Sequence, residues 1–126
     1  MEDSEPMVEI NIFRNDPDVR QLAEGETLFR QGDAGTEMYA VVDGEVDLVC
    51  EGAPIDRIGP GGILGEMALI DQSPRSATAV AATAARVVPV DKRRFTFLVQ
   101  EHPTFALLVM ETMAARIRRG NTRVVT

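Results

Sequence analysis

The sequence predicts a mainly β domain, either a β-sandwich or a jelly-roll barrel, that ends in two α-helices. Two observations lead to this prediction. Nine of the ten glycines fall within residues 25–65, and short segments that alternate between polar and apolar side chains lie between them. This pattern is typical of short strands joined by tight turns. After Val90 the apolar residues recur at steps of three and four, as they do along one face of a helix.

Composition limits the class of protein. The chain has 126 residues, of which 44% are hydrophobic and 26% charged, as in an ordinary globular domain. It contains no run of 18 apolar residues, so we expect no membrane span. The acidic N-terminus lacks the apolar core of a secretory signal. The single cysteine, Cys50, excludes an internal disulfide. We therefore expect a cytoplasmic protein.

Charge is distributed unevenly along the chain. Residues 1–91 carry 6 basic and 18 acidic side chains, whereas residues 92–126 carry 7 basic and 2 acidic ones. An acidic body argues against a nucleic-acid surface, which needs cations for the phosphates. The basic end could contact an acidic protein partner, or its arginines could simply stabilise a helix C-terminus.

The strands are expected within residues 19–90, after an N-terminal segment, residues 1–18, that we expect to be partly flexible. Residues 38–42 and 45–50 alternate as strands do, and Asp43-Gly44 between them predicts a two-residue hairpin turn. Thr78 to Val90 is interpreted as the closing pair of strands.

Helices are expected over residues 91–119. Asp91 is a suitable N-cap for a first helix that ends near Glu101, and Pro103 fits the first turn of a second helix. Gly120 is expected to end that helix. Its apolar stripe, which could pair with a second copy of the chain or close on the barrel, contains residues at four-residue steps: Phe105, Val109, Met113 and Ile117.

The stretch from Gly65 to Ala79 carries the strongest functional signal. The guanidinium of Arg75 has the planar shape that binds phosphate oxygens in pairs. Residues 67–70 indicate a short helical turn whose free N–H groups could face the same anion. Ser76 could donate its hydroxyl, and Glu66 could accept a hydrogen bond from a sugar hydroxyl. The alternative is that Glu66 and Arg75 form an ordinary ion pair.

This stretch resembles the phosphate-binding cassette of cyclic nucleotide-binding domains. The matching residues are Gly65-Glu66-Met67-Ala68-Leu69 and Pro74-Arg75-Ser76-Ala77-Thr78. The resemblance extends upstream to Leu28-Phe29-Arg30-Gln31-Gly32-Asp33, Met38-Tyr39 and Asp43-Gly44. It is closest to the bacterial domains and to the regulatory subunits of cyclic-AMP-dependent protein kinase. It implies an eight-stranded jelly-roll β-barrel followed by two α-helices, with residues 19–126 forming one domain.

The resemblance also implies roles for individual residues. Arg75 would bind the exocyclic oxygens of a cyclic phosphate, Glu66 would bind the ribose 2′-hydroxyl, and Gly65 would let the backbone approach it. Four backbone N–H groups would complete the phosphate cradle: those of Met67, Ala68, Ser76 and Ala77. A C-terminal lid over the base would come from residues 110–117.

The predicted function is therefore a sensor module that binds a cyclic nucleotide. Ser76 favours cyclic AMP over cyclic GMP, because threonine is frequent at this position in cyclic-GMP-selective domains. A domain of the same fold that has lost the ligand and docks a protein partner is the alternative. The one histidine, His102, lies outside the barrel, so the chain offers neither the histidine ligands of a jelly-roll metalloenzyme nor a catalytic triad. We expect no enzyme, no metal and no cofactor. These residues also contain no DNA-binding domain, and the downstream partner and the oligomeric state stay open.

Overall fold

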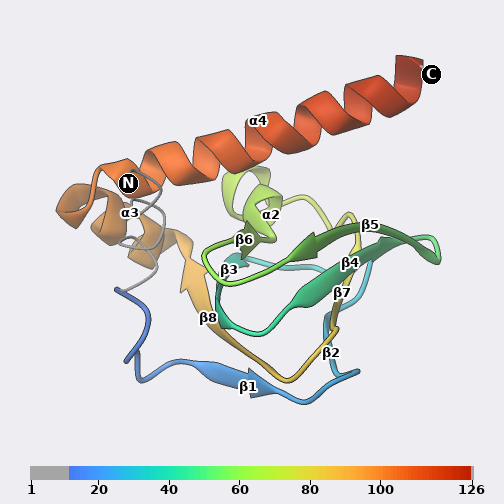
Figure 1. The fold of residues 1–126 in the computed structure, drawn as a ribbon. Coiled ribbons are helices and arrows are strands. Elements are labelled where there is room, and N and C mark those ends of the chain that lie inside the picture. Colours follow the sequence, from blue (N-terminus) through green and yellow to red (C-terminus); the bar gives the residue numbers. More distant parts are fainter. Residues whose placement is uncertain (1–11, 126) are drawn as a thin grey trace, which may run out of the picture.

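Two four-stranded antiparallel sheets form the body of the molecule (Figure 1). A computed structural model describes residues 12–125, and the side chains of residues 12–119. The first sheet has the order β1 (Arg20–Leu22), β8 (Ala85–Asp91), β3 (Glu37–Asp43) and β6 (Ile63–Leu64). The second has the order β2 (Thr27–Phe29), β7 (Thr78–Ala81), β4 (Val46–Cys50) and β5 (Ala53–Ile58). The predicted jelly-roll class is confirmed, although the two sheets do not join into one continuous barrel.

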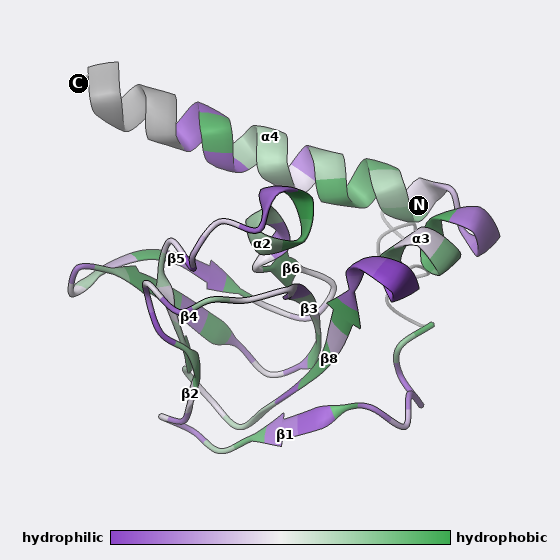
Figure 2. Ribbon diagram, turned by 180° about the vertical axis from the view of Figure 1, so that it is seen from behind, coloured by the Kyte–Doolittle hydropathy of each residue, from purple (hydrophilic) through white to green (hydrophobic). Residues whose placement is uncertain are grey.

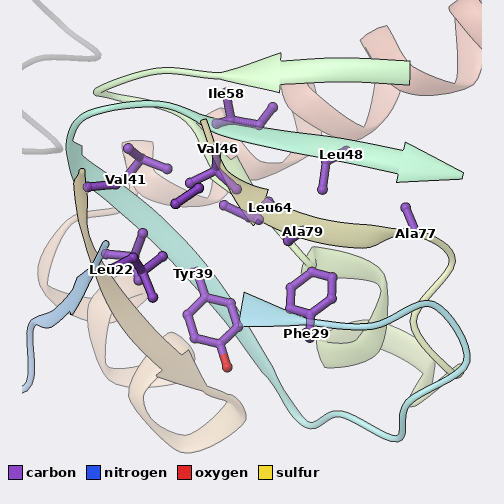
Figure 3. Close-up of a cluster of buried hydrophobic side chains, with 13 residues drawn as sticks. Leu22, Phe29, Tyr39, Val41, Val46, Leu48, Ile58, Leu64, Ala77 and Ala79 are labelled. Carbon is purple, nitrogen blue, oxygen red and sulfur yellow. The ribbon is translucent and has the colours of Figure 1, made fainter. Parts of the chain in front are cut away.

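The first hydrophobic core lies between the two sheets (Figure 3). Both sheets contribute to it, with Tyr39 and Val41 from β3 and Val46 and Leu48 from β4. The rings of Phe29 and Tyr39 stack with their centroids 5.9 Å apart. Alternate residues of each strand enter this core, as the period of two requires.

The second core lies on the other face of the first sheet, beneath the helices. The even-numbered residues of β3, Met38 to Val42, belong to it, so β3 is buried on both faces. Phe13 is fully buried here and meets Phe105 edge to face at 6.0 Å. Residues 12–15 form a turn that brings Phe13 into this core. The segment expected to be partly flexible was residues 1–18, and residues 1–11 of it lie outside the described residues.

The hairpin predicted at Asp43-Gly44 is wrong. β3 pairs with β8 and β6, whereas β4 pairs with β5 and β7, so the turn carries the chain from one sheet to the other. Gly44 does have a positive φ of 78°, and a side chain there would collide with the backbone of Ala84. The turn chemistry was therefore correctly identified. Both hydrogen-bonding edges of β3 are already paired, one with β8 and one with β6, so no edge is left for β4.

Three helices complete the described fold: α2 (Glu66–Asp71), α3 (Lys92–Glu101) and α4 (Thr104–Val125). The Asp91 side chain caps α3 by accepting a hydrogen bond from the amide of Arg94 at 2.8 Å. α4 lies across α2 in both views, and hydrophobic and hydrophilic segments alternate along it (Figure 2). Among the described residues, no helix is long and apolar enough to cross a membrane.

Two expectations for α4 are corrected. The helix does not end at Gly120 but continues to Val125, because one glycine in a helix costs only about 1 kcal/mol. Phe105 and Val109 are buried as predicted, but Ile117 is 60% exposed. Each step of four residues turns the side chain about 40° beyond a full helical turn, so Ile117 points about 120° away from Phe105. A stripe at steps of four therefore leaves the face that packs on the core.

Candidate functional site

The site begins at the turn that starts α2. Gly65 has a φ of 76°, in the left-handed region that favours glycine. A Cβ at this position would lie 2.7 Å from Nη1 of Arg75. Glycine is therefore required twice, once for the backbone conformation and once for the approach of the guanidinium.

Arg75 is a buried cation. Its residue is only 7% exposed, and its guanidinium lies over the Phe29 ring, 4.2 Å from Cζ to the centroid. The backbone carbonyl of Gly65 accepts a hydrogen bond from Nη1 at 3.3 Å, while Nε is buried without a partner. No carboxylate of the described residues lies within 4 Å of it, so the alternative of an ion pair between Glu66 and Arg75 does not hold.

Two further features surround this guanidinium. Gly35 lies directly against it, since a Cβ on Gly35 would be 2.4 Å from Cζ of Arg75. The Tyr39 ring centroid is 5.7 Å from the same atom. Burial raises the pKa of the Tyr39 phenol, and the nearby charge of Arg20 opposes this rise only in part. The phenol therefore stays neutral near pH 7 and supplies no counter-charge to Arg75.

The backbone of Arg75 is fixed by the loop after β2. Its carbonyl accepts a hydrogen bond from the amide of Gly32, and its amide donates to the carbonyl of Asp33, both at 2.8 Å. These two bonds join the segment Leu28–Asp33, which is part of the resemblance, to the cassette. Main-chain hydrogen bonds therefore hold the backbone of Arg75 independently of the contacts of its side chain.

Glu66 has a partner that the sequence did not predict. It is 3% exposed at the first position of α2, and both its carboxylate oxygens lie 2.6 Å from Nη1 of Arg116 in α4. Nη2 of the same arginine donates to the carbonyl of Ile63 at 2.8 Å. A side chain of the last helix thus reaches the cassette directly.

A second carboxylate, Asp56 of β5, extends this network. Arg119 donates to Asp56 Oδ2 at 2.9 Å, and Nε of Arg116 lies 3.7 Å from the same oxygen. Burial raises the pKa of Asp56. Hydrogen bonds from Arg119 and from the amide of Arg57, together with the charges of Arg119 and Arg116, lower this pKa by a larger amount. The net pKa lies below the ordinary value, so Asp56 is ionised at neutral pH.

Arg75, Glu66, Asp56 and the two arginines of α4, Arg116 and Arg119, line one cavity of about 290 Å³ between the cassette, β5 and α4. The structure brings together every predicted ligand-binding residue around this cavity: Gly65, Glu66, Met67, Ala68, Arg75, Ser76 and Ala77. Met113 and Ile117, from the predicted lid, line it as well. Ser76 is exposed, whereas Ala77 is only 5% exposed and belongs to the first core.

Arg116, Arg119, Asp56 and Gly35 were missed as site residues. The two arginines had been assigned to a helix C-terminus or an acidic partner, because a helix sequence does not reveal which strand it crosses. Their spacing of three residues does place them on one helix face, and that was the only available signal. Within the described residues, no group of three or more His, Cys, Asp or Glu side chains could hold a metal ion.

Comparison with known proteins identifies the family. The model of the cyclic nucleotide-binding domain matches residues 19–102. The chain belongs to this family. It is 37% identical to a cAMP-dependent protein kinase regulatory subunit of Eremothecium gossypii, over 64% of the chain and 18% of that protein. It is also 37% identical to a cyclic nucleotide-gated potassium channel of Mesorhizobium japonicum, over 80% of the chain and 27% of the channel.

The fold comparison agrees with the family. The crystal structure of Thermus thermophilus catabolite activator protein superposes with a TM-score of 0.76 at 28% identity, over 93% of this chain and 57% of that one. The chain thus spans only part of each relative. By their names, these cyclic nucleotide-binding relatives are regulators and a channel.

Proposed function

We propose that the chain binds a 3′,5′-cyclic nucleotide and acts as a non-catalytic regulatory module. The observation that carries this proposal is the buried charge of Arg75. A cation that is 93% buried, with no carboxylate of the described residues within 4 Å and with an orphaned Nε, costs several kcal/mol unless an anion compensates it. A cyclic phosphate would supply that anion with one negative charge and two exocyclic oxygens.

The remaining groups fit the rest of such a ligand. Met67, Ala68, Ser76 and Ala77 also line the cavity, and their amides would donate to the phosphate. Glu66 would accept from the ribose 2′-hydroxyl while it keeps Arg116, because an ionised carboxylate has about four acceptor positions. We further propose that residues 110–117 of α4 cover the base, and that Ser76 favours cyclic AMP over cyclic GMP.

We also propose that α4 pairs with a second copy of the chain. Three of its apolar side chains are more than half exposed: Leu107 at 54%, Met110 at 55% and Ile117 at 60%. Together with Ala114 they follow steps of three, four and three, which is the a/d spacing of a coiled coil. We call these four residues the α4 seam. The seam lies on a different face from Phe105 and Val109, and of its four residues Ile117 is the one that also lines the cavity.

Calorimetric titration with cyclic AMP and with cyclic GMP tests the main proposal. We expect saturable binding of both, with cyclic AMP the tighter ligand, and a rise in melting temperature with each. The absence of both heat and thermal shift at high micromolar ligand would contradict the proposal. The alternative, a protein-interaction domain without ligand, would then be favoured.

Arg75→Lys gives a sharper test of the phosphate cradle. Lysine keeps the charge but loses the planar pair of donors, and each charge-assisted hydrogen bond contributes about 1.5–3 kcal/mol. We expect cyclic AMP to bind at least tenfold more weakly to this variant in the same titration. Arg93→Lys, at an exposed position of α3, is the matched control and should bind like the parent. Equal affinity of Arg75→Lys and the parent would show that Arg75 does not hold the phosphate.

A further inference from the structure

The part of the cavity formed by β5 and α4 contains a polar pair that the phosphate and ribose assignments leave unused. Asp56 and Arg119 both line the cavity and are joined by a hydrogen bond of 2.9 Å. Arg116 lies between this pair and Glu66, because its Nη1 contacts Glu66 and its Nε lies 3.7 Å from Asp56. With the ribose at Glu66, a base directed toward β5 and α4 would meet Asp56 and Arg119.

The surroundings of the pair suit a flat aromatic ring. Leu48 and Ile55 line the cavity from the second sheet, and Met113 and Ile117 line it from α4. Apolar side chains on both sides would cover the two faces of a base. Only an edge of the base would then meet polar groups, which here are the carboxylate of Asp56 and the guanidinium groups of Arg116 and Arg119.

Asp56 keeps unused capacity to accept hydrogen bonds. Its Oδ1 accepts from the amide of Arg57 at 2.9 Å, and its Oδ2 accepts from Arg119. A carboxylate offers about four acceptor positions and, when ionised, no donor. Its side chain is 19% exposed, so it is partly shielded from water. A ligand group beside it must therefore donate a hydrogen bond or be repelled.

Resting on the proposed function, we propose that Asp56 and Arg119 select the base by its exocyclic amine. The 6-amino group of adenine donates to Asp56, and Arg119 donates to the ring nitrogen beside it. A neighbouring acceptor and donor on the protein thus match the neighbouring donor and acceptor on adenine. Guanine in the same orientation places its 6-oxo oxygen, an acceptor, against the carboxylate. Asp56 is thereby a specificity-determining residue for cyclic AMP.

The test compares cyclic AMP with its 6-chloropurine analogue, in which chlorine replaces the amine. Phosphate and ribose are unchanged, so the ratio of the two dissociation constants isolates the contact of the amine. We expect the parent chain to bind cyclic AMP about tenfold or more tightly than the analogue, since the lost bond is made to a charged group. In Asp56→Ala this ratio should fall to about one, whatever happens to the absolute affinity.

Two further variants separate recognition from structural support. Arg119→Ala breaks the tie between α4 and Asp56 but keeps the carboxylate, so both ligands should weaken together and their ratio should persist. Asp47→Ala removes a carboxylate that pairs with Arg57 outside the cavity and should leave both affinities unchanged.

The outcomes distinguish this inference from the proposed function. Equal binding of cyclic AMP and the analogue by the parent chain overturns the role of Asp56 while leaving cyclic nucleotide binding intact. A parent-like ratio in Asp56→Ala overturns it as well. If the parent binds neither cyclic AMP nor cyclic GMP, the proposed function itself fails, and this inference fails with it.

Discussion

At the residue scale, Arg75 depends on two glycines for the space that its guanidinium occupies. Gly65 could be predicted as part of the site, because it belongs to the cassette pattern and has a positive φ. Gly35 could not, because its backbone conformation is one that any residue adopts, and nothing in the local sequence indicates an arginine across the loop. When a side chain distant in sequence, here Arg75, packs against a glycine, the residues around that glycine carry no sequence pattern that reveals it.

Gly35→Ala should therefore weaken cyclic AMP binding more than the addition of one methyl group suggests. The added methyl group would lie 2.4 Å from Cζ of Arg75, so the guanidinium must move. We expect stability to fall by about 1–3 kcal/mol, as for an overpacked core, and affinity for cyclic AMP to fall at least tenfold. Urea unfolding and calorimetric titration measure the two effects.

Gly59→Ala is the matched control for this substitution. Gly59 also has an ordinary φ, and nothing lies within 4 Å of a Cβ added there. The control should keep the affinity of the parent. An unchanged affinity in Gly35→Ala would show that Arg75 can shift without losing the ligand.

At the scale of elements, the segment before β1 is docked onto α3. Asp16 forms an ion pair with Arg94, whose guanidinium also lies 5.5 Å from the ring centroid of Phe13. Burial raises the pKa of Asp16, but hydrogen bonds from Arg94 and the amide of Asp18, with the charge of Arg94, outweigh it. The net pKa lies below the ordinary value of 3.8.

This lowered pKa predicts acid sensitivity. The stability contributed by Asp16 is fully present above its unfolded pKa, near 4, and is lost as the pH falls through the lower folded pKa. Asp16→Asn should therefore be less stable than the parent at pH 7, with a smaller loss between pH 5 and pH 2. Urea unfolding over this range measures the difference. If the free energy of unfolding changed with pH in the same way in the two proteins, this ion pair would have no such role. Asp33→Asn, at an exposed loop position, is the control.

Elements were predicted best where one local rule decides them. The Asp91 cap and the short helix after Gly65 follow from a few neighbouring residues. Strand partners do not: Asp43-Gly44 specifies a turn, but β3 pairs along both edges with strands that are distant in sequence, β8 and β6. The end of α4 failed for a similar reason, because the cost of Gly120 is small compared with the helix that surrounds it.

At the scale of the whole molecule, α4 has two apolar faces with different tasks. One face packs Phe105 and Val109 into the second core, and the other carries the α4 seam. The sequence indicated both possibilities as alternatives, pairing or closing on the barrel. In the structure, the first two residues of the predicted stripe, Phe105 and Val109, are buried in the second core, whereas Ile117 lines the cavity and is 60% exposed.

The seam predicts a dimer in solution. Sedimentation equilibrium at micromolar concentrations should give twice the mass of 13.8 kDa. Met110→Glu should raise the dimer dissociation constant at least tenfold, since an unpaired carboxylate would be buried. Phe97→Glu, at an equally exposed position of α3, should stay dimeric. A parent chain that is monomeric at all concentrations would contradict this pairing.

The main-chain bonds between Gly32, Asp33 and Arg75 have a practical consequence. They hold the cassette in place whatever side chain stands at position 75. A variant at this position should therefore lose nucleotide binding but keep the fold. Expressed in a cell in place of the parent, such a chain would separate two kinds of role. Processes that need the signal would stop, while those that need only the presence of the protein would continue.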